Sequence, residues 1–200
     1  HFVRECVARR GAPQAGSRGL GDFSAEKSAY PKRATSSVIK IVDLFAGSGC
    51  VGVAVLTHLP EARVDFGELE ARHLATIKKN CEVNGVSERA RVIQTDVWES
   101  VTGTYDFILA NPPYLSTGRI ERVQDSVLEH EPAESLFADD DGFALIEKAL
   151  RGLPLHLKKG GSAWIEHEPE HTERIQSLAR SLGYVATTHK DQYDTERYSI

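Results

Sequence analysis

The 200-residue sequence contains no methionine, not even at position 1, and only three cysteines. The missing start residue leads us to expect a processed or cut piece of a longer protein, or an incomplete reading frame. Cys6, Cys50 and Cys81 are odd in number and widely spaced, so they predict no disulfide framework and no zinc site, and they fit a reducing compartment. No apolar run approaches the roughly 18 residues that a membrane-spanning helix needs. We therefore expect no membrane attachment and a cytoplasmic location, or a mitochondrial one if the source is eukaryotic.

The sequence also lacks the basic bias of proteins that bind nucleic acid, because its net charge is −5. The charge is uneven. Residues 1–37 hold seven Lys and Arg against three acids, so the remaining residues are markedly acidic. This balance disfavours nucleic acid as the substrate. The Gly, Pro and Ser content of residues 11–37 and their lack of periodicity predict that 1–37 is an arm or linker, either a remnant or partly disordered, before a catalytic domain over 38–200.

From Val38 onward, short apolar runs alternate with amphipathic segments. We expect strands at about 38–44, 62–67, 90–95, 105–110, 162–167, 184–189 and 196–200, and helices at about 50–58, 69–83, 142–156 and 169–182. This alternation predicts an α/β fold with a doubly wound, mostly parallel sheet and helices on both faces.

The strongest chemical signal is Asn111-Pro112-Pro113-Tyr114, directly after the apolar run 105–110. Ligands of open α/β sheets bind at the carboxyl ends of strands. The prolines fix the backbone and leave carbonyl groups free to accept hydrogen bonds. The Asn111 amide offers a further acceptor, and Tyr114 offers a flat ring. The four residues therefore suit an –NH2 group on a planar acceptor, such as an amide, an adenine or a guanine.

A second set of residues predicts a nucleoside site. Asp43 ends the first strand before Gly47-Ser48-Gly49, where a tight structural turn is the alternative interpretation. Glu68 ends the second strand, where an acidic side chain can bind ribose hydroxyls. Asp96 follows the third strand and could meet an adenine edge, with Val97 and Trp98 packed on the ring. A G-x-G-x-x-G motif and a Walker lysine are both missing, which disfavours a pyrophosphate or triphosphate ligand and favours S-adenosylmethionine.

These residues resemble the class I S-adenosylmethionine methyltransferases that methylate nitrogen. The segments Asn111–Ser116, Glu129–Leu136 and Asp140–Phe143 narrow the resemblance to the HemK-type protein-(glutamine N5) methyltransferases, over roughly residues 38–200. The resemblance implies a Rossmann-like seven-stranded sheet whose last strand is antiparallel. It implies a monomer that methylates the Gly-Gly-Gln glutamine of class 1 peptide chain release factors and releases S-adenosyl-L-homocysteine.

The same resemblance implies the roles of individual residues. Asn111, Pro112 and Tyr114 are the expected catalytic residues, and Asn111 also contacts the cofactor. The same three residues are expected to bind the substrate together with Pro113 and Glu131, although Glu131 could equally be a salt-bridge partner. The remaining cofactor-binding residues are expected to be Asp43, Phe45, Gly47, Gly49, Glu68, Asp96, Val97 and Trp98.

Two alternatives remain open at this point. The run Asp43–Gly49 also occurs in ribosomal-RNA guanine N2-methyltransferases, so a nucleic-acid amino methyltransferase is one alternative, although Asn111 rather than Asp favours the glutamine substrate. A non-catalytic module that binds S-adenosylmethionine is the other. Residues 1–37 show no helical docking domain of the kind that the family carries.

A competing motif, His167-Glu-Pro-Glu-His171, matches the H-E-x-x-H pattern of zinc proteases. That chemistry needs both histidines one turn apart on a single helix. His167 follows an apolar strand and Pro169 lies in the first turn of the next helix, so the expected geometry fails and we predict no metal site.

Overall fold

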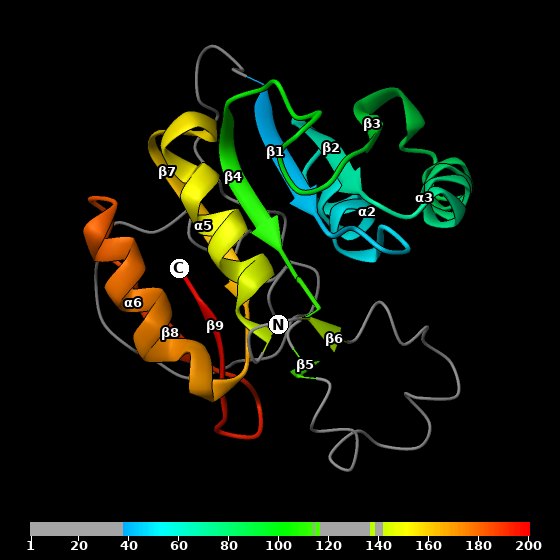
Figure 1. Cartoon of the computed structure of the whole chain (residues 1–200). Coiled ribbons are helices and arrows are strands. Elements are labelled where there is room, and N and C mark those ends of the chain that lie inside the picture. Colours follow the sequence, from blue (N-terminus) through cyan, green and yellow to red (C-terminus); the bar gives the residue numbers. More distant parts are fainter. Residues whose placement is uncertain (1–37, 114, 117–136, 139–141) are drawn as a thin grey trace, which may run out of the picture.

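A single seven-stranded sheet organises the protein, in the order β3-β2-β1-β4-β7-β9-β8 (Figure 1). The structure, a computed structural model, describes residues 38–113, 115–116, 137–138 and 142–200. The strands are β1 (Ile39–Leu44), β2 (Ala62–Glu68), β3 (Ala90–Gln94), β4 (Tyr105–Ala110), β7 (Leu157–Glu166), β8 (Thr188–Lys190) and β9 (Glu196–Ser199). Strands β3, β2, β1, β4 and β7 pair in parallel, and β9 runs antiparallel to both β7 and β8. The predicted doubly wound sheet with an antiparallel last strand is confirmed.

Helices cover both faces of the sheet. They are α2 (Cys50–His58), α3 (Ala71–Val83), α5 (Ala144–His156) and α6 (Thr172–Ser181), with 3-10 turns η1 (Ser87–Arg89) and η5 (Pro169–His171). Alternate residues of β1 face opposite sides of the sheet. Ile39 and Ile41 pack in one core cluster with residues of α2 and α3, whereas Val42 and Leu44 pack in the other with residues of α5 and α6. Two apolar layers therefore enclose the sheet, one on each face.

Three details differ from the expected elements. Strand β7 begins at Leu157 instead of about 162, and its register against β4 shifts between Tyr105 and Phe107. Gly160, with φ +78°, supplies a backbone conformation there that other residues rarely adopt. Strand β8 begins at Thr188 instead of about 184. A short parallel pair, β5 (Leu115–Ser116) and β6 (Phe137–Ala138), was not predicted, since two-residue strands leave no periodicity to detect.

The two histidines of the H-E-x-x-H motif lie on different elements, as expected. His167 follows β7, and His171 ends η5. The His167 ring is buried; its Nδ1 donates to the Glu168 carbonyl at 2.8 Å, and its Nε2 lies 2.8 Å from Ser199 Oγ. Burial lowers the pKa of His167. Both ring nitrogens are thus occupied by hydrogen bonds within the fold.

None of the described helices is both long enough and apolar enough to cross a membrane.

Candidate active site

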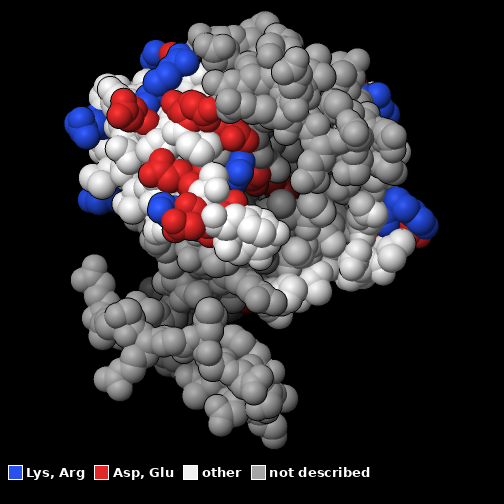
Figure 2. Space-filling view, turned by 90° about the horizontal axis from the view of Figure 1, so that it is seen from below, with Lys and Arg blue, Asp and Glu red and all other residues white. Residues whose placement is uncertain are grey.

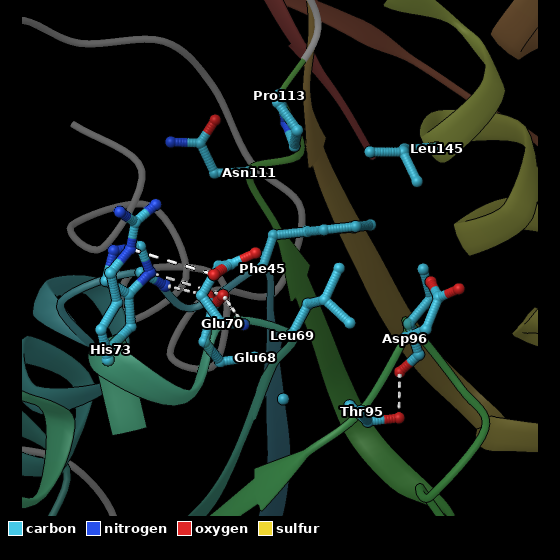
Figure 3. A pocket seen from close by; sticks show the side chains of 14 residues that line it. Phe45, Glu68, Leu69, Glu70, His73, Thr95, Asp96, Asn111, Pro113 and Leu145 are labelled. Carbon is cyan, nitrogen blue, oxygen red and sulfur yellow. Dashed lines mark hydrogen bonds and ion pairs between the residues drawn. The ribbon is translucent and has the colours of Figure 1, made fainter. Parts of the chain in front are cut away.

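A cavity opens at the carboxyl edge of the sheet (Figure 3). The strands β1, β2, β3 and β4 all end beside it, because parallel strands bring their carboxyl ends to one edge. Seven of the residues expected at the site line it: Phe45, Gly47, Glu68, Asp96, Val97, Asn111 and Pro113.

The two glycines in the turn after β1 have different surroundings. Gly47 (φ +54°) lines the cavity, and a Cβ built on it meets no atom of the described residues within 4 Å. Gly49 (φ +76°) faces the core, where a Cβ would lie 3.2 Å from Ile77 and 3.3 Å from Phe66. Gly47 therefore leaves open space beside the backbone for a ligand, whereas Gly49 permits close packing between the turn and α3.

Glu68 presents its carboxylate to the cavity at the end of β2 and is 7% exposed. Its Oε2 accepts a hydrogen bond from Gly47 N at 2.7 Å, and its Oε1 accepts one from Glu70 N at 2.9 Å. His73 Nδ1 lies 3.4 Å from Oε1. Each carboxylate oxygen can accept two hydrogen bonds. The backbone amides therefore fix the carboxylate and leave acceptor capacity for a pair of neighbouring hydroxyl groups.

Asp43 lies behind the turn rather than on the cavity wall. Its carboxylate is 3% exposed, and its Oδ2 accepts a hydrogen bond from Gly52 N, in the first turn of α2, at 2.9 Å. Burial raises its pKa to about 7, although this hydrogen bond opposes the shift and nearby Glu68 adds to it. Asp43 thus satisfies an unpaired amide at the start of α2, and any effect on the cofactor would act through the turn.

The loop that follows β3 places Asp96 on the cavity wall. Of the three non-glycine residues with positive φ in the described ranges, Phe45 (56°) and Val97 (54°) both line the cavity. Such conformations cost about 1–3 kcal/mol each and gather at functional sites. Thr95 supports the loop, because its hydroxyl accepts a hydrogen bond from Ser100 N at 2.9 Å.

The structure places Trp98 against α5 rather than on the cavity wall. Its Nε1 donates to the Ala149 carbonyl at 3.1 Å, and its ring stacks on His156 with centroids 4.3 Å apart. Close approach is possible because α5 carries Gly152 beneath the indole. The expectation that Trp98 packs on an adenine ring does not fit this placement. In the fold, Trp98 anchors the loop that carries Asp96.

Gly152→Ala is predicted to destabilise the protein. A Cβ at this position would lie 2.2 Å from Trp98 Nε1, so the indole must move and give up its hydrogen bond and stacking. We expect a net loss of about 1–3 kcal/mol in the free energy of unfolding, measured by urea denaturation. The matched control repeats the substitution in a Trp98→Ala background, where the penalty should vanish. An equal penalty in both backgrounds would contradict the anchoring role.

The acceptor end of the cavity is built by the residues that follow β4. Asn111 is exposed and lines the cavity, Pro112 is buried, and Pro113 is half-buried and lines the cavity. Figure 3 shows Asn111 and Pro113 together on one side of the cavity, with Glu68 and Asp96 on the other. Tyr114 and Glu131, both expected at the site, lie outside the described residues.

Sequence reasoning missed several wall residues, of which Leu69 is the most informative. Its side chain is 57% exposed although it lines the cavity. Its position between Glu68 and Glu70 at a strand end was the available signal, but sequence alone does not show whether such a leucine faces the core or a ligand. The other missed residues are Gly67, Glu70, Arg72, His73, Thr95 and Leu145.

Comparison with known proteins explains this arrangement. The profile of the Methyltransferase small domain family matches residues 32–140. The chain belongs to this family. The structure of a methyltransferase from Pyrococcus furiosus superposes with a TM-score of 0.61 at 19% identity, covering 80% of this chain and 72% of that one. The class I methyltransferase fold is thereby confirmed, and the methyl donor of this family and fold is S-adenosyl-L-methionine.

Three curated relatives carry more specific names. A release factor glutamine methyltransferase of Chlorobaculum tepidum is 30% identical over 146 residues, which is 70% of this chain and 49% of the relative. A ribosomal protein uL3 glutamine methyltransferase of Neisseria meningitidis is 34% identical over 125 residues, 62% and 41% of the two chains. A 4-amino-L-phenylalanine/4-methylamino-L-phenylalanine methyltransferase of Streptomyces pristinaespiralis is 31% identical over 165 residues, 81% and 54%. The chain spans about half the length of these relatives.

The cavity fits the donor. The open space at Gly47, the fixed carboxylate of Glu68 and the exposed apolar side chain of Leu69 suit an adenosine with free ribose hydroxyls. Glu68 would hold the ribose, Asp96 the adenine edge, and the Gly47 backbone would lie close to the ligand. When bound, the donor supplies an electrophilic methyl group on a sulfonium.

Proposed function

We propose that this domain transfers a methyl group from S-adenosyl-L-methionine to the side-chain N5 of the glutamine in the Gly-Gly-Gln loop of class 1 peptide chain release factors. The observation that carries the proposal is the position of Asn111-Pro112-Pro113, the described part of the motif. The segment directly follows β4, and Asn111 and Pro113 line the cavity that fits the donor. A planar amino group held there faces the donor.

An amide nitrogen is a poor nucleophile because its lone pair is delocalised into the carbonyl. Hydrogen bonds from its two N–H groups to the Asn111 side-chain oxygen and the Pro112 carbonyl would aim the nitrogen at the methyl group. They would also stabilise the positive charge that develops on nitrogen. Positioning two reactants can lower a barrier by about 7–11 kcal/mol, and one aimed dipole contributes about 2.7–4 kcal/mol. The proton leaves a cationic product, so the chain needs no dedicated base before transfer.

The relatives support this acceptor class. Two of them are named for glutamine and the third for an aromatic amine, and the nitrogen of a glutamine side chain or of an aromatic amine is attached to a planar carbon. Acidic side chains gather on the described part of the face that holds the carboxyl edge of the sheet (Figure 2). A polyanion is repelled by such a surface, which disfavours the nucleic-acid alternative and favours a protein loop.

Methyl transfer from radiolabelled donor tests the proposal. The chain is incubated with an intact release factor, the same factor with its Gly-Gly-Gln glutamine replaced, ribosomal protein uL3, bulk RNA and bulk DNA. We expect label on the intact release factor and none on the variant. Label on uL3 would reassign the protein substrate, and label on RNA or DNA would establish the nucleic-acid alternative. Bound donor without label on any acceptor would establish the non-catalytic module.

A further inference from the structure

We propose that Lys148 of α5 is a positioning residue that sets the preference of the cofactor site for a 6-amino purine, by holding the carboxylate of Asp96. This inference rests on the proposed role of Asp96 as the residue that binds the adenine edge.

The contact that carries the inference is an ion pair at the cavity wall. Lys148 Nζ lies 2.7 Å from Asp96 Oδ2 and 3.9 Å from Glu99 Oε1. The side chains of Lys148 and Asp96 are 41% and 38% exposed, and Asp96 lines the cavity. The ammonium occupies one oxygen of the carboxylate, so Oδ1 remains as the acceptor for a ligand.

The backbone beneath Asp96 is already fixed to the same helix. Two residues further on, Trp98 donates to the Ala149 carbonyl and stacks on His156. With the loop anchored in this way, the main remaining freedom at this wall is rotation of the Asp96 side chain. The ion pair with Lys148 restricts that rotation, and the backbone position of Lys148 on α5 is set by its buried neighbours Ala149 and Leu150.

A fixed carboxylate discriminates between purines through the chemistry of hydrogen bonding. An ionised carboxylate only accepts, and the 6-amino group of adenine donates. The 6-oxo group of hypoxanthine only accepts, so it would face the carboxylate without a hydrogen bond. A site that pairs with a ligand N–H rejects an analogue that lacks it. A carboxylate that is free to rotate away loses part of this discrimination.

Calorimetric affinities for S-adenosyl-L-homocysteine and S-inosyl-L-homocysteine test the proposal without any turnover. We expect the wild-type protein to prefer the adenosyl compound by about tenfold or more. Lys148→Met keeps the aliphatic stem but removes the charge. For a half-exposed pair we expect its adenosyl-to-inosyl ratio to fall by about two- to fivefold. Lys148→Arg retains a donor for the carboxylate and should restore the ratio.

Lys158→Met is the matched control, since Lys158 forms a similar ion pair with Asp106 at 2.8 Å beside the start of β4, at the opposite edge of the sheet. Its ratio should equal that of the wild type. A Lys148→Met protein with an unchanged ratio, including one whose two affinities fall equally, would overturn the positioning role.

Asp96→Asn distinguishes the adenine-binding role of Asp96 from the positioning role of Lys148. A ratio unchanged by Asp96→Asn would refute the adenine role of Asp96 itself, whereas a ratio altered by Asp96→Asn but not by Lys148→Met would refute Lys148 alone.

Discussion

Replacing Asn111 by alanine is expected to lower methyl transfer by about 10²–10³ in turnover while the protein still binds S-adenosyl-L-homocysteine. The substitution removes the side-chain oxygen that would accept an N–H from the acceptor amide. The rate of methyl transfer itself should fall, because the carbonyl dipole of Asn111 would stabilise the positive charge that develops on nitrogen in that step. Single-turnover transfer to the release factor and calorimetric binding of the product separate the two effects.

Asn84→Ala provides the matched control for that measurement. Asn84 follows α3 on the exposed surface, and its Nδ2 donates to the Asn80 carbonyl at 2.8 Å, so its loss should leave turnover unchanged. A further variant, Asn111→Asp, keeps acceptor oxygens at the same position and should lose less than the alanine variant. Near-normal turnover in Asn111→Ala would contradict the acceptor role of the side chain.

The second large effect concerns stability and comes from Asp43. Its pKa is about 7 in the folded protein against an ordinary value of 3.8, so the folded state binds the proton more tightly than the unfolded state does. The stabilisation of the folded state that comes from this tighter proton binding is fully present below about pH 4. It is lost as the pH rises through 7 and the Asp43 carboxyl becomes ionised. The difference between these two pKa values corresponds to about 4 kcal/mol in the free energy of unfolding. Asp43→Asn, which retains an oxygen for the Gly52 amide, should abolish this dependence and be the more stable protein at pH 8.

Urea denaturation between pH 4 and pH 8 measures the difference between the two proteins. Glu173→Gln serves as the control, since Glu173 is an exposed acid near the start of α6 and its amide variant should follow the wild-type curve. Parallel curves for Asp43→Asn and the wild type would show that burial does not hold the Asp43 carboxyl in its protonated form.

The elements of the fold were largely predictable because their signals are local. The run Tyr105–Ala110 is apolar and bounded, and it forms β4 with the expected limits. Cys50–His58 likewise forms a helix over the expected range. Strand β7 begins earlier than expected because Lys158 and Lys159 make its first residues polar, and such a polar segment is typical of a loop. Pairing with a neighbouring strand, not local hydrophobicity, decides that boundary.

The site was predictable only in part. Glu68, Asp96 and Asn111 were expected at one edge because each ends or follows a strand, and all three line the cavity there. Trp98 was expected to pack on a ligand and instead packs on α5, since an aromatic residue beside the site could equally do either. Only the space above Gly152 decides between the two. Leu69 and Leu145 were missed, because nothing in sequence separates an apolar side chain that lines a cavity from one that fills the core.

The sequence by itself determined the order of strands and helices, the glycine turn, and the kinds of polar group delivered to the carboxyl edge. The spacing of apolar residues, the residue types in turns and the positions of strand ends can each be recognised from a few neighbouring residues. Tertiary structure alone decided that Asp43 is buried against α2, that Trp98 anchors its loop on α5, and that Lys148 reaches Asp96. The contacts of Trp98 and Lys148 join segments about 50 residues apart, and the burial of Asp43 depends on how α2 packs against the end of β1. Packing sets these contacts, because a close approach such as that of Trp98 over Gly152 exists only after the sheet and both helix layers have assembled.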